Sequence, residues 1–388
     1  MVADNGVLLL DFNCFALTWH PLPPASRYRD GGLVRLIRPM NLARICTVVL
    51  AVGLVVPVPS LGAQATTKRP ATSTARKAAP KKPTYSARAS SARKARLARA
   101  RAAARAREQA RLRTLQVAMT PRFKTDASGA LVPDVRAAAA IILDPTTGLV
   151  LWQENAQEKR SIASITKVMT AVVFLEDQPD LSQVVTIERG DVYAASTTYL
   201  RANERATLDN LLHLTLIASD NAAARALARL SHGGTASFVE RMNTKAVELG
   251  LESTSFTDPS GLGADNISSA YDLSRLISYA SSDERIAPIM RTAEYKVATS
   301  RRTINIHNTN RLVIDGDVTV MAGKTGFISK AGHCLATLLQ MPQGNQIAVV
   351  VLGANSNPGR FWETRHLVNW FSQKTTEFFR KDQQQQDE

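Results

Sequence analysis

The order in which apolar patterns follow one another constrains the fold of this chain more than any other feature. Two apolar runs, 137–143 and 149–153, flank the turn DPTTG, as the strands of a hairpin do. Apolar residues at helical spacing fill the middle of the chain. Three further runs, 318–329, 334–341 and 347–353, are joined by short turns that contain glycine. Strands, then helices, then strands predict an α+β sandwich in which the first and last strands share one sheet.

Five stretches are expected to form helices. They span 164–176, 208–218, 238–249, a segment that begins after Ser269, and 361–379. Thr207, Ser237 and Ser269 each precede one of these helices and have a hydroxyl that suits an N-cap, and Ser161 is expected to cap the first. Glu240 completes a capping box with Ser237. The last helix carries apolar residues on one side, and we expect it to pack on the sheet rather than on a membrane surface.

The positive charge of the chain is concentrated in one stretch. Residues 66–113 contain 11 Arg and 5 Lys against one Glu, a net charge of +15 that equals the formal net charge of all 388 residues. This stretch has almost no large apolar side chains to bury, so residues 66–116 are predicted to form a disordered linker. Its prolines favour an extended first half, while repulsion between neighbouring arginines limits its second half to a partial helix.

A secretory signal is expected before the basic stretch. Residues 40–65 combine a basic start, an apolar run of 12 residues from Ile45 to Val56, and the sequence Ala-Gln-Ala at the end. The apolar run is short for a membrane anchor, which needs ~20 residues, so cleavage after Ala65 is favoured over retention. Residues 1–39 do not resemble a signal, and translation is expected to start at Met40.

The cysteines and histidines predict neither a disulfide nor a metal site. Cys14 and Cys46 lie in the part expected to be removed, which leaves Cys334 alone as a small buried strand residue. The six histidines are scattered and lack the spacing of metal ligands. No metal and no cofactor are therefore expected.

Three short motifs carry the functional prediction. Ser-x-x-Lys occurs twice, at 91–94 in the basic stretch and at 164–167 at the start of a predicted helix. Ser-Asp-Asn occurs at 219–221, between two predicted helices, and Lys-Thr-Gly at 324–326 in the first C-terminal strand. Together these motifs are the set that class A β-lactamases and penicillin-binding proteins share. Their order, and the element on which each lies, make chance a poor explanation.

The first residues of these motifs suit acyl transfer through a serine. Ser164 is a weak nucleophile that needs a base, and Lys167 lies one helical turn away. Lys167 can act only when neutral, and both burial and a second cation, Lys324, are expected to lower its pKa. Ser219 is expected to pass a proton towards the leaving nitrogen. Backbone N–H groups of Ser164 and Phe327 are expected to form the oxyanion hole.

The remaining motif residues are expected to bind the substrate. Asn221 can form a hydrogen bond with the substrate amide. Lys324 and the Thr325 hydroxyl can hold a carboxylate. Gly326 is expected to let the ligand lie against the edge of the strand.

The segments RSIASITKVMTA, LIASDNAAARALA, NTKAVELGLESTSFTDPSGL, HNTNRLV and GKTGFISKAGHCLA resemble the low-molecular-mass penicillin-binding proteins, which are D-alanyl-D-alanine carboxypeptidases and endopeptidases. IASITK, NTN and TGF…AGHCL are most similar to the penicillin-binding protein 7 type endopeptidase. The resemblance implies a serine β-lactamase/DD-peptidase-like fold, with a five-stranded antiparallel sheet and helices on both faces. It also implies an acyl-enzyme on Ser164, peptidoglycan peptides as substrates, and covalent inhibition by β-lactam antibiotics. Only 35 residues follow Gly353, too few for the second domain of the carboxypeptidase branch, so a soluble periplasmic endopeptidase is favoured.

Other interpretations stay open at this point. A carboxypeptidase breaks a bond after the same D-Ala and differs only in the leaving amine. A β-lactamase needs a Glu that activates water, but Glu240 is explained by its capping box and no Glu-x-x-x-Asn follows Ser-Asp-Asn. A protein that binds anionic envelope surfaces through residues 66–113 is a third alternative, whereas export argues against nucleic acid as a partner. The expected catalytic domain spans 117–380, and 381–388 is expected to be a disordered tail.

Overall fold

The computed structural model describes residues 87–386. The expected upstream extension 1–39, the expected signal peptide 40–65 and the first part of the basic linker, 66–86, lie outside the described residues. Residues 387–388 of the expected tail lie outside them as well.

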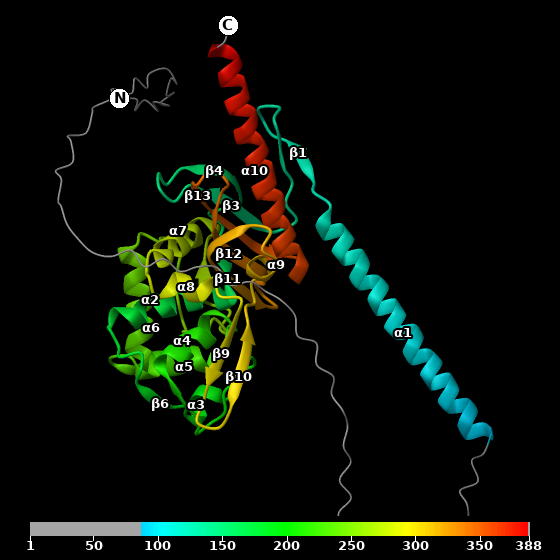
Figure 1. Cartoon of the computed structure of the whole chain (residues 1–388), viewed down its shortest axis with the longest axis vertical. Helices are drawn as coiled ribbons and strands as arrows, with labels where there is room; N and C mark the ends of the chain where they lie inside the picture. The colour runs from blue at the N-terminus through cyan, green and yellow to red at the C-terminus, as the bar shows by residue number, and fades with distance from the viewer. Residues whose placement is uncertain (1–86, 387–388) are drawn as a thin grey trace, which may run out of the picture. The chain divides into compact units, whose positions relative to one another are not determined.

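A five-stranded sheet forms the centre of the described chain (Figure 1). Its strands are β3 (Ala139–Leu143), β4 (Val150–Glu154), β11 (Thr319–Ile328), β12 (Gly332–Gln340) and β13 (Gln346–Ala354). Their order is β11-β12-β13-β3-β4, and every neighbouring pair is antiparallel. Ile142 of the early hairpin lies opposite Val349 of the last strand. The first and last strands therefore share one sheet, which confirms the predicted topology.

Helices cover both faces of this sheet, because alternate side chains of its strands are apolar on both sides. Ile141 packs in the larger core cluster, beneath α7 (Ala270–Ser281). Its neighbour Ile142 packs in a second cluster with Leu367 of α10 (Asn357–Gln386), on the opposite face. Figure 1 shows α10 along one face and α7 on the other. The last helix therefore packs on the sheet, as expected.

Most of the remaining elements build a lobe of helices and short strand pairs beside the sheet, whereas the first strand pair, within residues 123–133, packs against α10. The helices are α2 (Lys167–Glu176), α3 (Arg189–Val192), α4 (Leu208–Leu216), α5 (Asn221–Leu230), α6 (Gly234–Glu248), α8 (Ile286–Met290) and α9 (Arg311–Asp315), with the 3-10 turn η1 (Ala163–Thr166). The short strand pairs are β1 (Phe123–Thr125) with β2 (Leu131–Pro133), β5 (Arg160–Ser161) with β8 (Ile267–Ser268), β6 (Val184–Thr186) with β7 (Arg205–Thr207), and β9 (Glu294–Ala298) with β10 (Thr303–His307). Helix α2 lies at the centre of the lobe and contacts α4, α5, α6 and α7.

Two of the expected helix caps are confirmed and two are wrong. The hydroxyls of Thr207 and Ser269 accept hydrogen bonds from backbone N–H groups in the first turns of α4 and α7. Helix α6 instead begins at Gly234, directly after Gly233, which has a left-handed backbone with φ +76°. Ser237 therefore lies inside the helix. Ser161 pairs with Ile267 in a short ladder, and this pairing moves the helix start beyond it, to η1.

The basic stretch differs from its prediction where the structure describes it. Helix α1 (Ala87–Met119) is continuous over 33 residues, so the disorder expected up to residue 116 is wrong from residue 87 onwards. Ala, Arg, Leu and Lys have the highest helix propensities, whereas a like-charge pair costs only ~0.2–0.5 kcal/mol. Met119 also anchors the end of α1 on α10, because its carbonyl oxygen lies 3.1 Å from Nε2 of His366.

The expected disordered tail is helical as far as the structure describes it. Helix α10 continues to Gln386, since the run KDQQQQ contains neither Gly nor Pro to end it. None of the described helices is long and apolar enough to cross a membrane.

Candidate active site

The three motifs, which are far apart in the sequence, meet at one pocket. The pocket has a volume of about 560 Å³ and lies where η1, the α4–α5 connection and β11 come together. Six of the eight predicted site residues line it: Ser164, Ser219, Asn221, Thr325, Gly326 and Phe327. The other two, Lys167 and Lys324, are 0% and 1% exposed and lie directly behind this lining.

Two glycines allow the backbone before and at Ser164 to approach its neighbours. A Cβ atom on Gly326 of β11 would lie 2.5 Å from the Ile162 carbonyl oxygen. A Cβ atom on Gly261 would lie 2.0 Å from the Ala163 carbonyl oxygen. Ala163 itself has φ +49°, a strained value that turns the chain into η1. Gly326 was expected to let a ligand lie against the strand edge. The structure shows that the missing side chain lets β11 pack against residues 162–165, the segment that contains Ser164.

Lys167 is a buried amine aimed at the Ser164 hydroxyl. Its Nζ lies 3.1 Å from Ser164 Oγ, 2.6 Å from Asn221 Oδ1 and 2.5 Å from the Ser260 carbonyl oxygen. Burial lowers the pKa of Lys167 to about 7, although the nearby carboxylates of Asp220 and Asp258 oppose this shift. At neutral pH a large fraction of Lys167 is therefore neutral and able to accept the Ser164 proton.

The second lysine holds the hydroxyl of the second motif. Lys324 Nζ donates to Ser219 Oγ at 2.8 Å and to the Thr325 carbonyl oxygen at 3.0 Å. Burial, followed by the positive charges of Lys167 and Arg360, holds the pKa of Lys324 well below its ordinary value. Lys324 was expected to lower the pKa of Lys167, but the cation that does so is Arg225; the charge of Lys167 instead lowers the pKa of Lys324. Ser219 has φ +59°, and such strain is common at functional sites.

Asn221 orients Lys167 from inside the protein. Its Nδ2 donates to the Ala195 carbonyl oxygen at 2.7 Å, while its Oδ1 accepts from Lys167. The preceding residue, Asp220, caps α5 by accepting from the Ala223 N–H, which fixes where the Asn221 side chain begins. The expected hydrogen bond from Asn221 to a substrate amide stays a prediction.

The loop that places the Ser260 carbonyl beside Lys167 was missed by sequence reasoning. The Asp258 carboxylate accepts hydrogen bonds from the backbone N–H groups of Ser260, Gly261 and Gly263 at 2.7–2.8 Å. Burial opposes ionisation of Asp258, but hydrogen bonds from the Ser260 hydroxyl, the N–H groups of Gly263 and Ser260, and the Asn266 side chain lower its pKa below the ordinary value. The signal available in the sequence was DPSGL, a run of turn-forming residues.

Two further residues at the pocket were also missed. Thr309 accepts a hydrogen bond of 2.7 Å from the Thr325 hydroxyl, so Thr325 is already oriented by the chain. Arg360 of α10 lines the pocket, is 6% exposed and donates to the carbonyl oxygens of Gly326 and Cys334 at 2.9 and 3.1 Å. No carboxylate among the described residues forms an ion pair with Arg360, and the charge of this guanidinium lowers the pKa of Lys324.

Phe327 and Cys334 differ in their access to the pocket. The Phe327 ring is 53% exposed and stacks on His333 at a centroid distance of 4.3 Å. Cys334 is fully buried in β12, as expected, and burial raises the pKa of its thiol, which makes it a poor nucleophile. Within residues 87–386, no group of three His, Cys, Asp or Glu side chains is arranged to hold a metal ion.

Comparison with known proteins assigns the family. Residues 126–356 match the peptidase S11 family, described as D-alanyl-D-alanine carboxypeptidase. The chain is 32% identical to the D-alanyl-D-alanine endopeptidase of Escherichia coli, over 63% of this chain and 80% of that protein. It is also 32% identical to the D-alanyl-D-alanine endopeptidase of Pseudomonas aeruginosa, over 62% of this chain and 78% of that protein.

Solved structures agree with this assignment. The Streptomyces K15 DD-transpeptidase aligns with a TM-score of 0.58 and 29% identity, over 62% of this chain and 98% of that one. A putative penicillin-binding protein homolog from Mycobacterium tuberculosis aligns with a TM-score of 0.58 and 26% identity, over 64% of this chain and 95% of that one. The chain therefore belongs to the peptidase S11 family of D-alanyl-D-alanine carboxypeptidases and is a serine hydrolase.

Proposed function

We propose that the protein is a D-alanyl-D-alanine endopeptidase that cleaves cross-links in peptidoglycan through an acyl-enzyme on Ser164. The contact of 3.1 Å between the Lys167 amine and the Ser164 hydroxyl supports this proposal most strongly. A lysine with a pKa of about 7 can take a proton from serine without help from histidine.

Acylation uses residues from all three motifs. The Ser164 hydroxyl gives its proton to neutral Lys167, and its oxygen forms a bond to the carbonyl carbon of D-Ala. Backbone N–H groups of Ser164 and Phe327 stabilise the negative charge on the carbonyl oxygen. The C–N bond then breaks, and Ser219 gives its hydroxyl proton to the leaving amine and takes a proton from Lys324, which donates to Ser219 Oγ. Water hydrolyses the acyl-enzyme in the second half of the reaction.

The substrate binds along β11. This strand lies at one edge of the sheet, so no further strand of the sheet pairs with its outer side, where an extended peptide can add. Arg360 brings positive charge to the same pocket, which suits a carboxylate of the peptide, and Lys324 lies directly behind the lining. The Thr325 hydroxyl, which donates to Thr309 in the free protein, turns towards the bound carboxylate. The same features suit β-lactam antibiotics, which carry a carboxylate beside the reactive carbonyl.

Cross-link cleavage is favoured over removal of a terminal D-Ala by the pattern of relatives. Three proteins named as endopeptidases are 32–35% identical and are covered over 78–82% of their length. Proteins named as carboxypeptidases are covered over only 62–65% of theirs. Purified cross-linked dimers and monomeric pentapeptides should be digested with the wild type and with Ser164→Ala. Monomers released from dimers support the proposal, whereas release of free D-Ala without monomers indicates a carboxypeptidase.

A β-lactamase is the less favoured function. Glu240, the candidate for activating water, is exposed on α6 and does not line the pocket. We therefore expect fluorescent penicillin to label Ser164 stably. Fast turnover of nitrocefin would show a β-lactamase instead.

Export to the periplasm and attachment to anionic envelope surfaces complete the proposal. Residues 91–113 of α1 carry eight Arg and one Lys against one Glu, and all of them are exposed. Deletion of residues 66–113 should leave peptidase activity unchanged and reduce the salt-dependent association with sacculi or anionic vesicles. Unchanged association would remove this part of the proposal. N-terminal sequencing of the mature protein tests cleavage after Ala65.

A further inference from the structure

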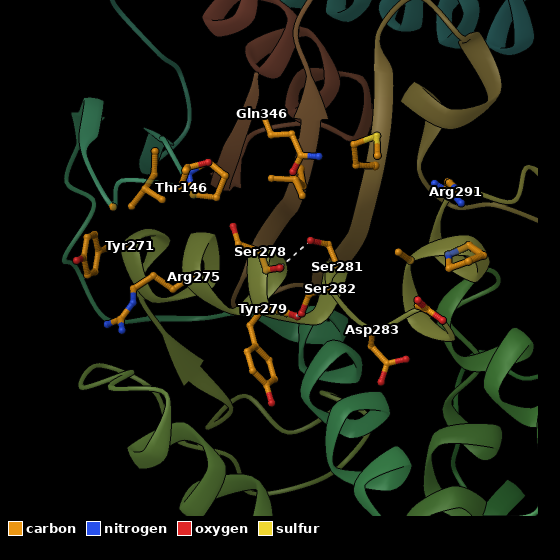
Figure 2. Close-up of a pocket in the computed structure, with 18 residues that line it drawn as sticks. Thr146, Tyr271, Arg275, Ser278, Tyr279, Ser281, Ser282, Asp283, Arg291 and Gln346 are labelled. Atoms are coloured by element: carbon orange, nitrogen blue, oxygen red, sulfur yellow. Dashed lines mark hydrogen bonds between the residues drawn. The ribbon is translucent and has the colours of Figure 1, made fainter. Parts of the chain in front are cut away.

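A second cavity lies at the other end of the sheet from the candidate active site. It has a volume of about 810 Å³ and is bordered by α7, α8, the turn 145–148 and residues from β11, β12 and β13 (Figure 2). None of its lining residues lines the pocket that contains Ser164. Met321, at this end of β11, is five residues from Gly326, so the two sites lie ~17 Å apart along the extended strand. We call this cavity the α7–α8 groove.

The α7–α8 groove has an apolar floor and a polar rim. Leu143 and Leu338 are buried beneath it, and Met321, Pro145 and Ala287 are partly buried around them. The rim contains Tyr271, Arg275, Tyr279, Glu284, Arg291 and Gln346. An apolar base with a few polar groups around it, at this volume, is typical of a site for a small molecule or a short peptide.

Several polar groups of the rim are free to bind a ligand. Among residues 91–377, no side-chain hydrogen bond or ion pair involves Arg291, Glu284 or Gln346. Arg275 donates to the Gly250 carbonyl oxygen and lies over the Tyr271 ring, but it has no carboxylate partner. The other acidic residue of the groove, Asp283, is already paired with a neighbouring arginine outside the groove.

The free charges therefore favour a ligand that carries carboxylates. The lining contains two arginines without a carboxylate partner, Arg275 and Arg291, and one carboxylate without a cationic partner, Glu284. Figure 2 shows Arg275 and Arg291 on opposite sides of the groove, with Tyr279 and Asp283 between them. Tyr279, which is 44% exposed, adds an aromatic ring to the rim of the groove.

We infer that the α7–α8 groove is a second binding site for D-alanyl peptides of the peptidoglycan polymer. The inference rests on the proposed function, because that function defines the polymer. Methyl side chains of alanine fit the apolar floor, and a free carboxylate pairs with Arg275 or Arg291. A polymer carries many such peptides, so binding one of them in the groove raises the local concentration of others at Ser164.

The test separates the groove from the catalytic pocket by blocking the latter. Full-length protein is acylated with penicillin, mass spectrometry verifies the adduct, and a fluorescent D-alanyl pentapeptide is titrated. The acylated wild type should still bind the peptide, and Arg291→Glu should weaken this binding about tenfold, since it replaces an attractive charge with a repulsive one. Arg301→Glu is the matched control, because Arg301 is exposed on the β9–β10 turn, away from the groove, and should change nothing.

Kinetics distinguish this inference from the proposed function. Arg291→Glu and Tyr279→Ala should raise the KM for intact sacculi and leave kcat/KM for a small soluble dimer unchanged. Circular dichroism checks that both variants are folded. Loss of all peptide binding on acylation would overturn the inference, as would displacement of the peptide by a glycan disaccharide that lacks peptide. Failure of penicillin to acylate Ser164 would instead overturn the proposed function.

Discussion

The substitution Asn221→Asp tests whether a buried, neutral Lys167 is the base. Asn221 Oδ1 lies 2.6 Å from Lys167 Nζ, so the substitution places a carboxylate at hydrogen-bond distance from the amine. At an effective dielectric constant of ~20, two unit charges at this distance attract each other by ~6 kcal/mol. Burying the new carboxylate offsets part of this attraction. A rise of about two units in the pKa of Lys167 is therefore expected.

The consequence is a shift in the pH profile of acylation. In the wild type the pKa of Lys167 is about 7, so roughly half of the amine is neutral at pH 7. With a pKa near ~9, the neutral fraction at pH 7 falls about fiftyfold. The rate of Ser164 acylation at pH 7 should fall by the same factor and recover as the pH rises above ~9. The assay is the second-order rate of labelling by fluorescent penicillin between pH 5 and 10.

Asn221→Ala is the matched control, because it removes the same oxygen without adding charge. Its acylation rate should reach a lower plateau, with the midpoint remaining close to the wild-type pH. A midpoint near pH 7 in Asn221→Asp, or no recovery at high pH, would refute the assignment of Lys167 as the base.

Three further substitutions test other parts of the site. Gly326→Ala brings a Cβ to 2.5 Å from the Ile162 carbonyl oxygen and should lower the free energy of unfolding, measured by urea titration, by ~1–3 kcal/mol. The control is Gly190→Ala, whose Cβ meets nothing within 4 Å and should change the free energy of unfolding by less than ~0.5 kcal/mol. Ser219→Gly relieves the φ of +59° but removes the hydroxyl to which buried Lys324 donates, so the two effects on the free energy of unfolding oppose each other, while turnover of cross-linked dimers should fall by ~10²-fold or more. An unchanged turnover would exclude the proton relay. Asp258 has a lowered pKa in the folded state, so its ionised form stabilises the fold above the unfolded value of 3.8, and this contribution is lost as the pH falls through the folded value. Asp258→Asn should therefore cost more stability at pH 7 than at pH 3 in urea unfolding, and an equal cost at both would contradict the role of the carboxylate.

Short-range patterns in the sequence determined much of the fold. The turn DPTTG and the glycine-containing turns predicted the hairpin and the three C-terminal strands. Both signals are local, because the alternation of side chains along a strand and the residue types of a turn depend only on residues close in sequence. Ser164 and Lys167 were paired for the same reason, since residues three apart share one face of a helix turn. The set of three motifs pointed to the penicillin-binding proteins and class A β-lactamases, and the match to the peptidase S11 family agrees with the former.

Local patterns were wrong where tertiary contacts compete with them. Ser161 and Ser237 both have the side chain of a helix cap, but Ser161 pairs with Ile267 across more than 100 residues and α6 starts one turn before Ser237. Charge repulsion in the basic stretch was weighed more heavily than the helix propensity of its alanines and arginines. The continuous helix α1 shows that propensity prevails there.

The chemistry of the site depends on contacts that only the tertiary structure creates. Lys167 donates to the carbonyl oxygen of Ser260, which lies 93 residues further along the chain. Arg360 of α10 donates to the carbonyl oxygen of Gly326 in β11. The pKa of Lys167 falls to about 7 because packing excludes water from its amine, and no property of the segment SITK encodes that exclusion. The sequence by itself determined which groups could react, whereas the fold decided their distances, their burial and therefore their protonation.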